Sequence, residues 1–280
     1  MRSVAAGLLL LPMLLFPLPS VAEELPVITI IIDDMGNHEG WGIGALDMPG
    51  PVTYAFLPHT QYARSLAEKA HLAGKEVMLH LPMESHSGNR LGPGGLTLHM
   101  TEKRFQHTLA EDIASIPHVK GVNNHMGSLL TQHPGAMGWL MQGLGAHGEL
   151  FFIDSRTSEQ TVARQVAEEH RIPNTRRDVF LDNNRDPAAI RAQFRQLIKQ
   201  AKRSGYAVGI GHPYPETARA LKPLLAETAS LGVRLIPASE IINAQGRNKP
   251  WQEPSSPSLK VAKNSKQSPS STCCDEPVLK

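Results

Sequence analysis

The chain has 280 residues, a formal net charge of +2 at pH 7 and only 5% aromatic residues, yet it contains 13 histidines. A charge so close to zero argues against a nucleic-acid-binding protein, for which a basic domain is expected. The only two cysteines, Cys273 and Cys274, are adjacent, which excludes a framework of disulfides and a metal site built from cysteine.

The first 22 residues have the pattern of a secretory signal peptide. Arg2 precedes an apolar run that is interrupted by prolines and is short for a bilayer span, and Ser20 and Ala22 supply the small residues that signal peptidase requires. We therefore expect residues 1–22 to be a signal peptide cleaved after Ala22. The mature protein is expected to be exported to a periplasm, without stable insertion into the membrane.

After the leader, apolar runs rich in β-branched residues alternate with stretches of helical periodicity. The predicted strands are 27–32, 52–57, 76–81, 121–125, 149–154, 177–182, 206–211 and 233–238. Helices are expected between them, among others at 61–74, 101–116 and 186–205. This alternation predicts an α/β fold, with parallel strands in a sheet or barrel and helices outside, in one domain over residues 23–245.

The composition changes after this domain. From Gly246 onward the chain is rich in Ser, Pro, Lys and Asn and has no apolar period. Residues 246–280 are therefore expected to form a disordered C-terminal tail.

Polar residues stand at the ends of successive predicted strands. In parallel α/β architectures the carboxyl ends of the strands meet on one face, where each loop can contribute to a common site. The residues at these ends are Asp33, Asp34, His80, Glu84, Asn123, Asn124, His125, Asp154, Ser155, Arg156, Asp182, Asn183 and His212. So many polar strand ends indicate a functional site rather than a series of solvated loops.

Three of these residues, Asp34, His80 and His125, have the chemistry of a metal site. Imidazole nitrogens and carboxylate oxygens are the ligands expected for zinc or a similar divalent ion, and a catalytic site keeps one position open. Asp33, on the opposite side of the pleat from Asp34, would stay free to act as a base. Each histidine taken alone is equally well explained as a hydrogen-bonded core residue.

A serine nucleophile is an alternative mechanism. Ser128 lies near His125 in the sequence and Ser155 follows Asp154, but neither serine stands in a G-x-S-x-G segment, so the metal hypothesis is favoured. Arg156 would either bind an anionic group of the substrate or pair with a neighbouring aspartate.

The chain resembles the divergent branch of the polysaccharide-deacetylase superfamily, whose domain has the NodB-type fold. The matching segments, in chain order, are IDDMG (32–36), HLPME (80–84), NNHMGS (123–128), FIDSRT (152–157) and GHPYPET (211–217). The resemblance extends from about Val27 to Ile242. It implies a distorted (β/α) barrel of parallel strands with outer helices.

The resemblance also implies roles for individual residues. Asp33 corresponds to the general base, Asp34 and His80 to ligands of a divalent metal, expected to be zinc, and His212 to the general acid that protonates the leaving amine. These implied roles make Asp33 and His212 the candidate catalytic residues.

The sequence departs from the superfamily at two motifs. Glu84 stands where the second metal histidine is expected, and the third motif of Arg-Pro-Pro-Tyr type is absent. We expect His125 to be the third ligand, with ligation by Glu84 as the alternative. Glu84, Asn124, Asp154 and Arg156 are expected to contact the substrate or to support the ligands.

These observations lead to three functional hypotheses. The favoured one is a metal-dependent hydrolase that removes N-acetyl groups from an amino-sugar polymer of the cell envelope. The second is a catalytically degenerate carbohydrate-binding or envelope-assembly protein on the same scaffold, and the third is a metal hydrolase of a peptide amide or an ester. The expected partner is a carbohydrate polymer or oligosaccharide, and the sequence predicts no particular oligomeric state.

Overall fold

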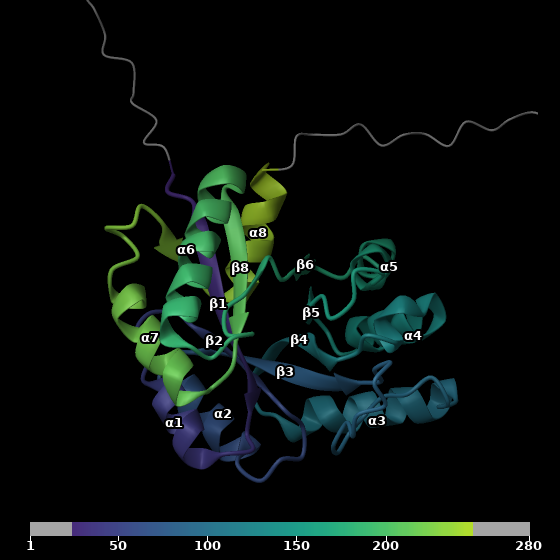
Figure 1. Ribbon diagram of the computed structural model, residues 1–280. Helices are drawn as coiled ribbons and strands as arrows, with labels where there is room; N and C mark the ends of the chain where they lie inside the picture. The colour runs from purple at the N-terminus through teal and green to yellow at the C-terminus, as the bar shows by residue number, and fades with distance from the viewer. Residues whose placement is uncertain (1–23, 249–280) are drawn as a thin grey trace, which may run out of the picture. The chain divides into compact units, whose positions relative to one another are not determined.

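Nine parallel strands within residues 24–248 form a sheet that curls into an incomplete barrel with helices around its outside (Figure 1). The computed structural model describes residues 24–248. The strands are β1 (Val27–Met35), β2 (Thr53–Phe56), β3 (Glu76–Met83), β4 (Val119–Met126), β5 (Phe151–Asp154), β6 (Asn174–Arg176), β7 (Val179–Phe180), β8 (Tyr206–Gly211) and β9 (Arg234–Leu235). Their order is β6-β5-β4-β3-β2-β1-β8-β7, and β9 pairs with β1. The expected distorted (β/α) barrel of NodB type is confirmed.

The helices follow the strands in the alternation that the sequence predicts. They are α1 (Glu39–Leu46), α2 (Ala63–Leu72), α3 (Glu102–Ser115), the short 3-10 helix η1 (Leu130–Gln132), α4 (Pro134–Ala146), α5 (Ala163–Glu169), α6 (Pro187–Ser204), α7 (Pro215–Ala226) and α8 (Ala238–Asn248). In Figure 1, α1, α6 and α7 lie to the left of the curled sheet and α3, α4 and α5 to its right, and all of them pack against its outer face. Within residues 24–248, no helix has the length and apolar character needed to cross a membrane.

The ends of α6 show how local sequence sets the helix boundaries. The carboxylate of Asp186 accepts hydrogen bonds from the main-chain N–H groups of Ala188 and Ala189, which satisfies two donors of the first turn. The helix ends at Gly205, whose φ of 83° is the left-handed conformation that glycine adopts at low cost.

The two edges of the sheet are joined by a very short segment. β6 and β7 stand at opposite ends of the strand order, but only Arg177 and Asp178 separate them in the chain. The predicted strand 177–182 therefore contributes only β7, and β6 was not predicted because its residues, Asn174 to Arg176, are polar and form no apolar run. The strands β6 and β7 do not pair with each other, so Arg177 and Asp178 connect the two edges of the sheet through the main chain alone.

Side chains of β1 alternate between two cores. Ile28, Ile30 and Ile32 pack in the larger core beneath the outer helices, whereas Val27 and Ile31 belong to a second core inside the barrel. Helix α8 contributes further apolar side chains to this inner core. The ends of the described chain lie where β1 begins, opposite the carboxyl end of this strand (Figure 1).

The predicted leader, residues 1–22, and nearly all of the predicted tail lie outside the described residues. Helix α8 ends at Asn248, so it includes the first three residues of the range expected to be a tail. Cys273 and Cys274 also lie outside the described residues.

Candidate metal centre and active site

The second-last residue of β1 has a left-handed backbone conformation. Asp34 has a φ of 54°, and the pairing of β1 with β2 shifts register between Ile32 and Met35. Regular alternation would place Asp33 and Asp34 on opposite faces, but both carboxylates line the same pocket. The expectation that Asp33 lies across the pleat from Asp34 is therefore wrong, because the irregularity turns the second carboxylate inward. Such conformations are uncommon outside glycine and gather at functional sites.

Asp34, His80 and His125 bring three electron-rich atoms together. Oδ1 of Asp34 lies 3.2 Å from Nε2 of His80 and 2.9 Å from Nδ1 of His125, and the two ring nitrogens are 3.1 Å apart. Ligands at the usual zinc distances in a tetrahedral site are separated by about 3.3 Å. Oδ1 of Asp34 is also buried and accepts no hydrogen bond from the described part of the chain. These residues therefore fit a divalent metal with the expected Asp-His-His donor set.

Asn123 fixes the orientation of His80. Its Oδ1 lies 2.8 Å from Nδ1 of His80, and its Nδ2 donates to Oδ1 of Asp33 at 2.8 Å. Because an amide oxygen only accepts, the proton of the neutral imidazole is on Nδ1 and the lone pair of Nε2 faces the ligand cluster. Asn123 and His125 are two residues apart on β4 and therefore share one face of the strand. This spacing was visible in the sequence, but no role was predicted for Asn123.

The charges of this cluster are tightly coupled. Burial alone would lower the pKa of His80, but the carboxylates of Asp33 and Asp34 raise it to about 9. Burial would raise the pKa of Asp34, but the imidazoles of His125 and His80 hold it well below its usual range. Metal binding to such a cluster displaces the imidazole proton, so metal affinity depends on pH.

Asp33 lies behind the ligands on the inner face of β1. Burial raises the pKa of this carboxyl group, while the nearby imidazoles of His80 and His212 act in the opposite direction. A carboxylate with a raised pKa is a better proton acceptor near neutral pH than an exposed one. This environment suits the predicted role of a general base.

His212 follows β8 and is held by Asp182. Nδ1 of His212 lies 2.9 Å from Oδ1 of Asp182, and the main-chain N–H of His212 donates to Oδ2 of the same carboxylate at 2.6 Å. Nε2 faces the cluster, 3.8 Å from Oδ2 of Asp34. Burial would lower the pKa of His212, but Asp182 raises it. The sequence placed Asp182 at a strand end without predicting this contact.

Two pockets lie beside the cluster of Asp34, His80 and His125. A pocket of about 250 Å³ is lined by Asp33, Asp34, His80, Asn124, His125, Met126, Ser155, Thr157, Arg177, Phe180, Ile210 and His212. A second, of about 230 Å³, shares Asp34 and His125 and is otherwise lined by Asn37, Leu57, Pro58, Thr60, Pro82, Arg90, Leu91, Gly92 and Pro93. Asp34 and His125 therefore line both pockets, an arrangement that can accept an extended molecule on either side of them.

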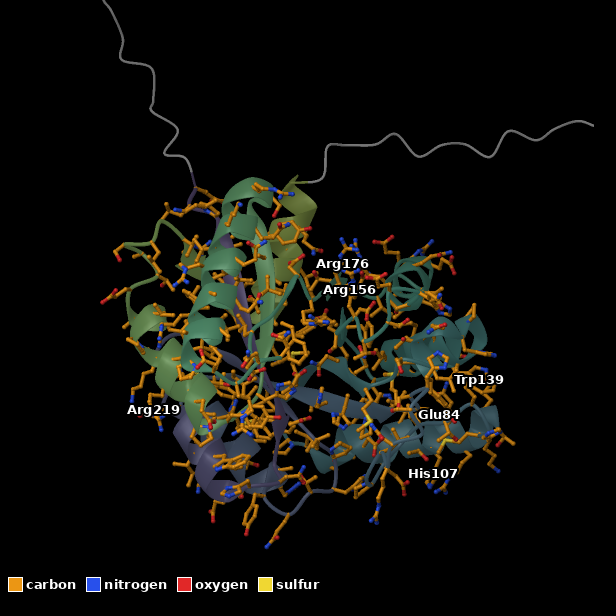
Figure 2. The ribbon with its side chains drawn as sticks, viewed as in Figure 1. Glu84, His107, Trp139, Arg156, Arg176 and Arg219 are labelled. Carbon is orange, nitrogen blue, oxygen red and sulfur yellow. The ribbon has the colours of Figure 1, made fainter. Side chains whose placement is uncertain are left out.

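The carboxylate of Glu84 binds a main-chain N–H group and is not part of the Asp34-His80-His125 cluster. Its Oε2 accepts a hydrogen bond from the main-chain N–H of Leu98 at 2.7 Å, and its main-chain oxygen accepts from Leu129 and Leu130. Figure 2 places its side chain toward α3. The geometry thus favours His125 over Glu84 as the third ligand.

Asn124, Asp154 and Arg156 tie together the loops after β4 and β5. Nδ2 of Asn124 donates to the main-chain oxygen of Met126, and its Oδ1 accepts the N–H of Ser155. Asp154 accepts the main-chain N–H of Arg156 at 2.8 Å, so the main chain of Arg156, not its guanidinium, binds this carboxylate. Asn124 also lines the pocket that contains Asp33, Asp34 and His212.

The serine alternative has no geometric support. Within residues 24–248, the hydroxyl of Ser155 is buried and has no hydrogen-bond partner, and Oγ of Ser128 accepts the main-chain N–H of His86. A serine nucleophile needs a base within hydrogen-bonding distance of its hydroxyl.

Aromatic residues that are scattered in the sequence gather beside His212. The ring centroid of Tyr214 lies 5.4 Å from that of His212 and 5.9 Å from that of Trp41. This cluster could not be predicted from the sequence, because Trp41 lies in α1 and Tyr214 directly precedes α7.

Comparison with known proteins supports this description of the fold. The family model for divergent polysaccharide deacetylases matches residues 30–242. The uncharacterized protein YibQ of Escherichia coli K12 is 35% identical over 225 residues, which cover 80% of this chain and 69% of YibQ. An uncharacterized protein of Haemophilus influenzae is 34% identical over 195 residues, 70% of this chain and 69% of that protein.

Two solved structures share the fold. An uncharacterized protein of Agrobacterium tumefaciens C58 superposes with a TM-score of 0.75 at 24% identity, covering 80% of this chain and 92% of that one. A mutant of the peptidoglycan deacetylase PdaC of Bacillus subtilis gives a TM-score of 0.50 at 14% identity, covering 80% and 94%. From the family match and the identity to its relatives, the chain belongs to the divergent polysaccharide deacetylase family.

Proposed function

We propose that this protein is a metal-dependent hydrolase that removes N-acetyl groups from an amino-sugar polymer of the cell envelope. The observation that carries the proposal is the convergence of the ligand atoms of Asp34, His80 and His125 within 3.2 Å of one another, in a pocket that also contains Asp33 and His212. A proton acceptor, a proton donor and a Lewis-acid site in one cavity are the groups that amide hydrolysis requires.

A divalent ion held by Asp34, His80 and His125, with zinc as the expected metal, would supply Lewis-acid polarisation of the amide carbonyl and of the attacking water. Asp33 would take the proton of that water at its free carboxylate oxygen. Asn123 keeps the base in place by donating to its other oxygen, Oδ1.

His212 would complete the reaction by protonating the departing amine. Asp182 holds Nδ1 of this imidazole and raises the pKa against the effect of burial, so that the ring carries a proton that Nε2 can donate into the pocket. The acid and the base thus come from β8 and β1, which pair directly in the sheet.

The polymer substrate and the location are inferred from other features. The two pockets beside the ligand cluster suit a chain that continues past the reacting sugar. The predicted signal peptide supports export to the periplasm, where envelope glycans are found.

The test is release of acetate from oligomers of N-acetylglucosamine by the mature protein loaded with zinc. We expect acetate release that is abolished by a chelator and by Asp33→Asn, but retained by Asp186→Asn, which removes a charge at the start of α6 while preserving the helix cap. Absence of acetate release by the zinc-loaded protein would contradict the proposal.

The departure at Glu84 favours one competing function, a glycan-binding protein without catalysis. Its carboxylate is occupied by Leu98, and it stands where the superfamily has a metal histidine. On this alternative, oligosaccharide binding would survive both chelation and Asp33→Asn, and no acetate would be released.

A further inference from the structure

Arg177 occupies an unusual place in the barrel. It is one of the two residues that join the edge strands β6 and β7, and it lines the pocket that contains Asp33, Asp34 and His212. The sequence predicted no role for it. A basic side chain in this position lies within reach of whatever enters the catalytic pocket.

The guanidinium of Arg177 is held rigidly. Its Nε donates to the main-chain oxygen of Ser155 at 2.7 Å, and its Nη2 donates to that of Arg156 at 3.0 Å. Its Cζ lies 4.9 Å from the centre of the Phe180 ring, a cation–π contact. Because these three contacts fix the plane of the group, little conformational entropy would be lost when it binds a ligand.

Most donors of this guanidinium remain free. An arginine side chain has five N–H groups, and these two hydrogen bonds use two of them; the rest have no partner among residues 24–248. The hydroxyl of Ser155, which lines the same pocket, is also buried without a partner. Unsatisfied polar groups of this kind are costly unless a ligand or water completes them.

The charge of Arg177 also lacks a direct counter-ion. Burial, and after it the charge of Arg156, lower the pKa of Arg177. Asp33, Asp154 and Asp178 act in the opposite direction, but the described residues include no ion pair of Arg177 within 4.0 Å. Each carboxylate already has a donor: Asp33 binds Asn123, Asp154 binds Thr161, and Asp178 binds the N–H of Val208.

We infer that Arg177 and Ser155 form a carboxylate-binding subsite inside the catalytic pocket, so that the substrate is an acidic glycan whose carboxylate lies next to the reacting N-acetyl group. This inference rests on the proposed function for the identity of the reacting group. A planar guanidinium matches a carboxylate with two parallel N–H···O bonds, and a hydroxyl donor beside it adds a third. Arg177 is thus a specificity-determining residue that does not take part in proton transfer.

The experiment compares two ligands that differ only at their carboxyl groups. One is a tetrasaccharide of alternating N-acetylglucosamine and N-acetylmuramic acid, and the other is the same tetrasaccharide with its carboxylates converted to methyl amides. Binding is measured by calorimetry with the full mature chain in the presence of a chelator, so that no turnover interferes. We expect the acidic form to bind about tenfold more tightly than the amide.

Four variants test which residues cause the tighter binding of the acidic tetrasaccharide. Arg177→Gln should remove the preference for the acidic form but still bind the amide, and binding of the amide shows that the pocket is intact. Arg177→Lys and Ser155→Ala should each reduce the preference, because each removes some of the donors. Arg176→Gln, at the exposed neighbouring position on β6 (Figure 2), should keep it.

Equal binding of the two tetrasaccharides to the wild-type chain, binding of neither, or a preference that survives Arg177→Gln would overturn the inference. The proposed function fails separately, if the zinc-loaded protein binds the acidic tetrasaccharide through Arg177 but releases no acetate from it. If acetate is instead released equally well from both ligands and they bind equally, the hydrolase stands and the carboxylate subsite does not.

Discussion

Asp182 binds His212 through both carboxylate oxygens, with Oδ1 at 2.9 Å from the ring Nδ1 and Oδ2 at 2.6 Å from the main-chain nitrogen. The hydroxyl of Thr217 donates to Oδ2 as well, at 2.7 Å. This arrangement fixes the position, the tautomer and the charge of the imidazole together. It joins the segment after β7 to the residue that follows β8.

We predict that Asp182→Asn lowers kcat for acetate release at least about tenfold, because an amide cannot accept both hydrogen bonds and no longer favours the protonated imidazole. Zinc content should be unchanged. Asp178→Asn is the control, since Asp178 precedes β7 and its carboxylate accepts, among the described residues, only the N–H of Val208. Equal rates for Asp182→Asn and the wild type would exclude a role of this pair in the reaction.

A second prediction concerns the hydrogen bonds that join Asn123 to His80 and to Asp33. Without this amide, Nδ1 of His80 loses its acceptor and Asp33 loses a donor. We expect Asn123→Ala to weaken zinc binding about 10–100-fold, as is typical when the partner of a ligating histidine is removed. Asn174→Ala, at the start of β6, should leave zinc affinity as it is. Competition with a chromophoric chelator measures both.

Gly36 shapes the turn after the two aspartates. It has a φ of 115°, and a Cβ at this position would lie 2.2 Å from Oγ1 of Thr60. We therefore predict that Gly36→Ala lowers the free energy of unfolding by about 1–3 kcal/mol, measured by urea denaturation. Gly44→Ala is the matched control: it is within α1 with nothing within 4 Å, and it should be neutral or stabilising by about 0.5–1 kcal/mol. Equal stability of the two variants would contradict this account.

Asp112 is buried in α3, where its Oδ1 lies 2.9 Å from Nε2 of His59 and its Oδ2 has no partner among the described residues. Burial, with a smaller contribution from Glu111, raises its pKa from 3.8 to about 8. The folded protein then retains a proton that the unfolded chain releases above about pH 4, so this group costs stability as the pH rises from about 4 to about 8.

We predict that Asp112→Asn becomes progressively more stable than the wild type over this pH range, because asparagine does not titrate. Urea denaturation at several pH values gives the difference directly. A constant difference between the two proteins from acidic to slightly alkaline pH would show that Asp112 stays ionised in the folded state.

Much of the fold followed from the sequence because buried parallel strands are short apolar runs that are easily recognised. The same reasoning anticipated that Asp34, His80 and His125 would meet, since the carboxyl ends of neighbouring strands share one face of the sheet. The edge strand β6 was missed because its residues are polar. The functional roles of Asp34, His80 and His125 remain predictions.

Other features depend on geometry that no local pattern reveals. The left-handed conformation of Asp34 breaks the alternation that placed Asp33 on the other face. The contact of Asp182 with His212 arises because β7 pairs with β8, and β7 has only two residues. The position of Arg177 in the pocket depends on the closure of the barrel, which is a property of the whole sheet.

We propose that Asp34, His80 and His125 hold one divalent metal. Calorimetric titration of zinc into the metal-free mature protein tests this proposal, with His125→Ala and, as control, His133→Ala, whose ring caps α4. We expect one zinc per chain for the wild type and for His133→Ala, and a loss of affinity of at least about 100-fold for His125→Ala. No zinc binding by the wild type, or unchanged affinity in His125→Ala, would contradict it.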